Sequence, residues 1–104
     1  MLILPIKKKW FDMILSGEKR EEYREIKPYY TTRFRNVWGY PVYWHEIHTV
    51  AFRNGYSHKS PLLVAKVSLG MGKGKPKWGA EEGKSYYILK ICDIEPQAES
   101  EDNI

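Results

Sequence analysis

The densest group of ionisable side chains lies between residues 16 and 24, where the sequence is Ser-Gly-Glu-Lys-Arg-Glu-Glu-Tyr-Arg. A lysine whose pKa is lowered by its surroundings can act as a base or nucleophile. An arginine can hold a phosphate, because its planar fork matches that anion. Two alternatives involve no function: Lys19 is a solvated lysine near the helix end, and Arg24 forms a structural ion pair. We therefore name Lys19 and Glu22 as candidate catalytic residues, and Lys19, Glu22 and Arg24 as candidate ligand-binding residues.

Two predicted elements position these side chains. Between residues 7 and 16, apolar side chains recur at helical spacing, and Gly17 stands where a left-handed residue ends a helix. Residues 21–26 alternate as in a strand, which places Glu22 and Arg24 on one face. The charged group thus begins directly after a helix and continues along a strand.

The remaining pattern predicts a mostly β fold of the α+β class. We expect residues 29–44 to form an irregular connection with one helical turn near residues 31–35, and the glycine-rich residues 70–83 to form a loop. Further strands are expected at residues 1–6, 46–53, 61–69 and 85–94. About five strands without regular alternation with helices favour a small antiparallel β-barrel with one or two short helices.

Aromatic side chains are concentrated between residues 29 and 44, where there are seven in sixteen positions. Core packing is one interpretation. Aromatic rings interleaved with arginines also suit single-stranded nucleic acid, whose bases stack on such rings. On this interpretation Tyr29 or Trp44 stacks on a base, both are candidate ligand-binding residues, and Arg53 is a further one.

Charge is unevenly distributed along the chain. The formal net charge is +4, yet residues 1–94 contain 17 basic and 9 acidic residues, a net +8. Such a body attracts polyanions, nucleic acid above all. Residues 1–94 are expected to form one domain, and residues 95–104 an acidic, disordered tail. With no leader and no membrane span in the sequence, we expect a cytoplasmic protein that does not bind membranes.

Other potential sites carry weaker signals. The lone Cys92 lies in an apolar run, where a thiol usually packs in the core. His45 and His48 would face opposite sides of a strand, so we expect no metal site. The lysine-bearing glycine loop lacks the spacing of a nucleotide-phosphate loop, and we expect no cofactor.

The motif Gly17-x-Lys19-x-x-Glu22-x-Arg24 after a short helix resembles the signature of the ASCH domains, which are related to PUA-like RNA-binding barrels. Residues 12–17, 52–57 and 78–81 are similar to short bacterial and phage members that consist of one domain. The resemblance covers residues 2–94. It implies a PUA-like barrel in which the signature residues line a cleft for RNA or a modified nucleoside.

Some members of that family are enzymes, and the resemblance extends to them in part. One branch removes the acyl group from acetylated cytidine with a lysine, a threonine and a glutamate, and others are reported to cut RNA. Lys19 corresponds to that lysine, whereas Glu22 stands where the threonine would be. Glu81 is the candidate for the remaining glutamate.

We carry forward three functional hypotheses. The first is binding of single-stranded RNA, or of one nucleoside, in the cleft. The second is a small hydrolase of the same fold, acting on an acylated nucleoside or on RNA with Lys19 as the catalytic residue. The third is a protein-interaction adaptor that uses exposed aromatic side chains.

Overall fold

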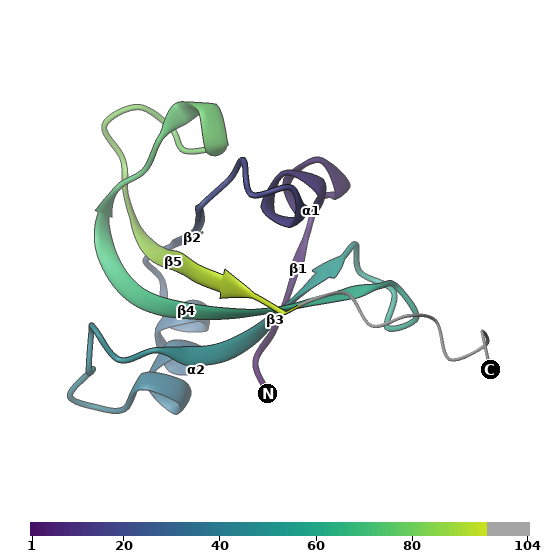
Figure 1. The fold of residues 1–104 in the computed structure, drawn as a ribbon. Helices are drawn as coiled ribbons and strands as arrows, with labels where there is room; N and C mark the ends of the chain where they lie inside the picture. Colours follow the sequence, from purple (N-terminus) through teal and green to yellow (C-terminus); the bar gives the residue numbers. More distant parts are fainter. Residues whose placement is uncertain (96–104) are drawn as a thin grey trace.

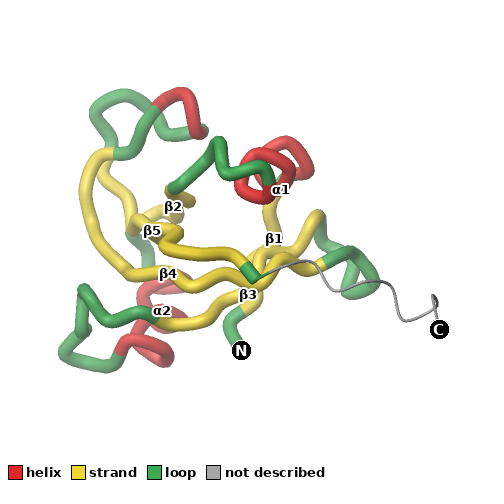
Figure 2. The backbone as a smooth tube through the Cα atoms, viewed as in Figure 1, coloured by secondary structure: helices red, strands yellow, loops and turns green. Residues whose placement is uncertain are grey.

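A computed structural model describes residues 1–95, which form a five-stranded mixed sheet with two α-helices (Figures 1 and 2). The tail predicted to be disordered lies outside the described residues, apart from Glu95. In chain order the elements are β1 (Ile3–Ile6), α1 (Lys8–Leu15), β2 (Glu21–Glu25), α2 (Pro28–Trp38), β3 (His48–Asn54), β4 (Leu62–Lys73), the 3₁₀ helix η1 (Pro76–Trp78) and β5 (Ser85–Ile94). The prediction of a mostly β, α+β protein is confirmed.

The strand order in the sheet is β1-β3-β4-β5-β2. β1 pairs with β3 in parallel, and the other three pairs are antiparallel. The sheet is thus mostly antiparallel, with one parallel pair at β1 and β3. Parallel neighbours need a long crossover connection, and here α1, β2 and α2 provide it. Within residues 1–95, β1 and β2 are the two edge strands, and no backbone ladder joins them.

The sheet is strongly curved (Figure 1), and alternate residues of its strands together with both α-helices form the hydrophobic core. Along β4, the alternate residues Leu63, Ala65, Val67 and Leu69 are buried against it, as the period of two requires. α1 and α2 lie on different sides of this core in Figure 1, and each contributes two fully buried side chains to it. Neither helix within residues 1–95 is long and apolar enough to cross a membrane.

Three local predictions are wrong. Residues 28–38 form a helix instead of an irregular connection, because Pro28 suits its first turn and Phe34 and Trp38, four apart, both face the core. β4 continues to Lys73, so Gly70 and Gly72 are strand residues and not part of a loop. Cys92 is exposed, since it follows the core-facing Ile91 on β5.

The connection between β4 and β5, residues 74–84, folds back over the edge of the sheet next to β2. Gly74 makes this possible, because a Cβ there would lie 2.6 Å from the Ala80 Cβ and 2.8 Å from the Tyr23 ring. The backbone N–H of Lys75 then donates a hydrogen bond to the Tyr23 hydroxyl at 2.9 Å. The loop is thus packed directly against a β2 side chain.

We predict that Gly74→Ala lowers the free energy of unfolding by about 1–3 kcal/mol, the usual cost of overpacking. Gly72→Ala is the matched control, because its new Cβ would meet only Ile88 Cδ1 at an ordinary 3.6 Å. Urea denaturation of the three proteins measures the difference. Equal midpoints for the two variants would show that the loop is not tightly packed at Gly74.

Candidate ligand-binding site

Three charged side chains from the motif meet at the edge of the sheet. Lys19 Nζ lies 3.1 Å from Glu22 Oε1, and Arg24 Nη2 lies 2.8 Å from Glu22 Oε2. Only 1% of Lys19 and 6% of Glu22 are exposed. One carboxylate is therefore held between two cations, away from water. We call Lys19, Glu22 and Arg24 the charged triad.

Local backbone geometry explains this convergence. Gly17 has φ 86°, and its N–H bonds the Ile14 carbonyl at 3.0 Å, so the chain turns sharply at the end of α1. The turn directs Lys19 back toward the sheet. On β2, Glu22 and Arg24 stand opposite the core residues Leu89 and Tyr87 of β5, so both face the inner side.

The Lys19 ammonium is enclosed by several groups. It donates a hydrogen bond to the Trp78 carbonyl at 2.7 Å and lies 4.8 Å and 5.0 Å from the ring centres of Trp10 and Tyr23. Burial lowers the pKa of Lys19, although the neighbouring Glu22 carboxylate acts in the opposite direction. The alternative of a solvated lysine after the helix is therefore wrong.

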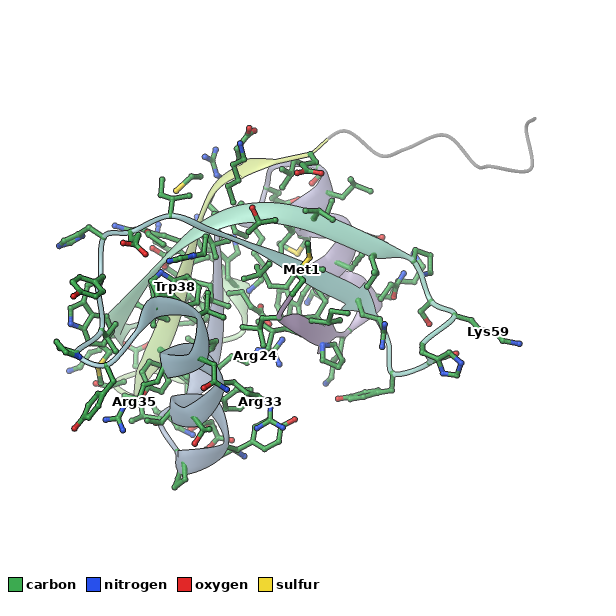
Figure 3. All side chains as sticks on the ribbon, turned by 90° about the horizontal axis from the view of Figure 1, so that it is seen from below. Met1, Arg24, Arg33, Arg35, Trp38 and Lys59 are labelled. Carbon is green, nitrogen blue, oxygen red and sulfur yellow. The ribbon has the colours of Figure 1, made fainter. Side chains whose placement is uncertain are left out.

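Arg24 joins the two edge strands of the sheet. Its Nη2 donates to the Pro5 carbonyl of β1 at 2.9 Å as well as to Glu22, and its Nη1 donates to the Tyr30 hydroxyl at 3.3 Å. Its Nε is buried without a hydrogen-bond partner. The guanidinium thus links β1, β2 and α2 where no backbone ladder does so. Figure 3 shows Arg24 beside α2.

A pocket of about 250 Å³ opens between β1 and β2. Glu22 and Arg24 form part of its wall, whereas Lys19 does not reach it. Five aromatic side chains surround the ion pair. The full lining is Pro5, Ile6, Lys7, Trp10, Glu22, Tyr23, Arg24, Glu25, Tyr30, Tyr56 and Tyr86. We call this cavity the aromatic pocket. It combines flat apolar surfaces with one carboxylate and one guanidinium.

Four residues of the predicted site lie elsewhere. Tyr29 is outside the pocket lining, although its neighbour Tyr30 is part of it. Trp44 lines a separate groove with Gly70 and Met71. Arg53 follows the core residue Phe52 and faces the opposite side of the sheet.

The fourth is Glu81, whose exposed side chain is absent from the pocket lining. Its backbone N–H donates to the Tyr86 hydroxyl at 3.0 Å. The structure therefore brings the charged triad together, but it does not bring these four residues to the aromatic pocket.

Sequence reasoning missed most of the pocket's aromatic residues. Trp10 is one of the apolar residues that recur at helical spacing between residues 7 and 16, and no motif includes Tyr56, which follows the Asn54-Gly55 turn. Tyr86 lies 5.7 Å from Tyr23 between ring centres, a pair that only the register of β2 with β5 creates. These rings come from five segments, so their spacing in the sequence carries no common signal.

The chain matches no protein-family model, no curated protein and no solved structure among those with which it was compared. Residues 1–95 contain no group of three or more histidine, cysteine, aspartate or glutamate side chains that could hold a metal ion. Chemical interpretation of the site therefore rests on the geometry of its own side chains.

We predict that Lys19 makes stability depend on pH. Between its lowered folded-state pKa and the ordinary lysine value near 10.4, the unfolded chain keeps a proton that the folded protein has lost. Rising pH therefore favours folding, by at most about 1.4 kcal/mol per pH unit for one group. Relative to Lys19→Met, wild-type stability should increase from pH 7 to pH 10 in urea denaturation.

The pH range of this comparison also avoids an opposing effect. Burial raises the pKa of the Tyr23 hydroxyl, so the folded state loses stability once the pH exceeds the ordinary tyrosine value of 10.0. The comparison ends at pH 10, below the range in which this contribution of Tyr23 acts. A stability difference that stays constant across the pH range would contradict the burial of a charged Lys19.

Proposed function

We propose that this protein binds a nucleobase, within single-stranded RNA or as a modified nucleoside, in the aromatic pocket. The observation that carries the proposal is the combination of five aromatic side chains with the Glu22–Arg24 ion pair in one small cavity. Bases displaced from a stack are typically bound by aromatic rings and by hydrogen bonds to their edges. The pocket offers both kinds of contact.

Pocket size is in keeping with one base. At about 250 Å³ the cavity lies just below the range of about 300–1,000 Å³ that is usual for sites of drug-sized ligands. Tyr56 is 86% exposed, so its ring is free to close over a ligand. The other four rings are held in the fold. Stacking contributes about 1–3 kcal/mol per base.

The ion pair retains hydrogen-bonding capacity toward a ligand. Each Glu22 oxygen receives one bond from the triad, and a carboxylate oxygen can accept two. Arg24 has five N–H groups, of which Nη1 makes only a long bond to the Tyr30 hydroxyl. An acceptor next to a donor matches a base edge, where amino groups lie beside ring nitrogens or carbonyls.

We also propose that the chain is an ASCH-type domain with a PUA-like barrel. Two features of the fold support this. The motif residues Lys19, Glu22 and Arg24 converge at one place, as a cleft signature should. The Arg24 bridge to the Pro5 carbonyl brings together the two edge strands of the curved sheet, as in a barrel whose last gap is spanned by a side chain.

Hydrolysis is the second candidate, favoured by the lowered pKa of Lys19 beside Glu22. A nucleophile must contact its substrate, however, and the Lys19 ammonium is covered by the Trp78 carbonyl outside the pocket lining. The geometry therefore favours binding. Product formation from acetylated cytidine or RNA that disappears in Lys19→Met, with the fold intact, would reverse this preference.

We predict that Tyr56→Ala weakens ligand binding about 5- to 150-fold, the equivalent of losing about 1–3 kcal/mol of stacking. Tyr56 is exposed and makes no core contact, so the fold should persist. Calorimetric titration with ribodinucleotides and with acetylated cytidine measures the effect.

Tyr43→Ala is the matched control, because Tyr43 is 61% exposed and lies outside the pocket. It should bind these probes as tightly as the wild type. The proposal fails if none of the probes binds the wild type, or if the two tyrosine variants bind equally.

A further inference from the structure

A second surface adjoins the aromatic pocket and carries several cations, of which Lys27 pairs with Glu25 at 3.6 Å, whereas Arg33 and Arg35 pair with no carboxylate within residues 1–95. Residues 26–45 contain no aspartate or glutamate, but they include Lys27, Arg33, Arg35 and seven aromatic residues. Four of these aromatic side chains are exposed, namely Tyr29, Tyr40, Tyr43 and Trp44. We call residues 26–45 the acid-free segment. Most of it is α2 and the loop that follows.

Two arginines of this segment stack on exposed tyrosines. Arg33 Cζ lies 3.4 Å from the ring centre of Tyr29, and Arg35 Cζ lies 4.0 Å from that of Tyr40. Tyr29 is 54% exposed and Tyr40 76%. Figure 3 shows the two arginines on different sides of α2. Each pair therefore presents a flat ring and a planar cation to solvent.

Neither arginine is neutralised by a carboxylate in the part of the chain that the structure describes, residues 1–95. Ion pairs there involve other cations, such as Lys8 with Asp12 and Lys84 with Glu25. Arg33 uses one N–H on the Tyr29 carbonyl at 3.0 Å, and its other donors remain available. Arginines stacked on aromatic rings and free of acid are suited to phosphate contacts along a nucleic acid strand.

The acid-free segment is continuous with the pocket. Tyr30, on the first turn of α2, lines the pocket and accepts a hydrogen bond from Arg24, and the preceding Tyr29 belongs to the first stacked pair. Because Arg33 and Arg35 lie on different sides of α2, a strand that contacts both crosses the helix, which is about 10–12 Å wide with its side chains. With about 3.4 Å per stacked nucleotide, this width corresponds to about three nucleotides.

We infer that the ligand of the pocket is a single RNA strand several nucleotides long, which continues from the pocket across α2, and not a free nucleoside. This inference rests on the proposed function. Arg33 and Arg35 contact phosphates of the strand, and the exposed rings of Tyr29 and Tyr40 provide surfaces on which its bases stack. The net charge of +8 on residues 1–94 favours the same partner.

Fluorescence anisotropy with labelled single-stranded RNAs of 2, 4, 6, 8 and 12 nucleotides tests this inference. Wild-type affinity should rise with length to about four nucleotides, one in the pocket and about three across α2, and then level off. In the double variant Arg33→Gln and Arg35→Gln, affinity for the 8-mer should fall at least about tenfold, with dinucleotide binding unchanged. The slope of log affinity against log salt should decrease by about 1.4, or 0.7 for each lost phosphate contact.

The matched control removes two charges from a different surface. Lys66 and Lys73 are exposed on β4, and neither lines the aromatic pocket or the groove that contains Trp44. Lys66→Gln with Lys73→Gln should therefore keep the wild-type length dependence and salt slope.

Three outcomes would overturn the inference. If the arginine variant binds the 8-mer like the wild type, α2 does not contact the strand. If dinucleotides bind with the full affinity of the 8-mer, the ligand is no longer than the pocket requires, and the proposed function survives. If no RNA of any length binds, the inference and the proposed function both fail.

Discussion

The structure depends on one buried carboxylate held between two cations. Removing a charge from water costs several kcal/mol, so an isolated Glu22, Lys19 or Arg24 at these positions would strongly destabilise the fold. When all three charges are present, their attraction offsets the free-energy cost of burying each of them. Removing one partner of such a pair typically costs about 3–5 kcal/mol, because the remaining charge is left buried and unpaired. Fold and site are therefore not separable at these three residues.

Each member of the triad also attaches a different part of the chain. Arg24 bonds the Pro5 carbonyl of β1, and Lys19 bonds the Trp78 carbonyl in the connection between β4 and β5. Glu22 stands between them on β2. The ion pair thus fixes the width of the gap between the edge strands, and this gap is the mouth of the aromatic pocket. The proposed ligand binding is therefore tested at side chains that line the pocket without holding the fold, such as Tyr56.

Strand alternation and the motif were enough to predict that Glu22 and Arg24 share a face and that Lys19 joins them. The burial of Lys19 was beyond sequence reasoning, because its hydrogen-bond partner lies 59 residues away at Trp78. The parallel pairing of β1 with β3 was likewise set by tertiary packing and not by the four residues of β1. In the segment of α2 and the loop after it, the exposed Tyr29 of the helix and Tyr40, Tyr43 and Trp44 of the loop obscured the core-facing period of Phe34 and Trp38.

The central claim is that a base enters the aromatic pocket, and the four tryptophans allow a direct test. Trp10 lines the pocket, Trp44 lines the groove beside Met71, and Trp38 and Trp78 are buried. The indole N–H signals in a ¹⁵N-resolved NMR spectrum therefore report on separate places. Titration with a ribodinucleotide should shift the Trp10 signal strongly and leave the Trp44 signal unchanged. A shift at Trp44 with none at Trp10 would place the ligand elsewhere and contradict the account.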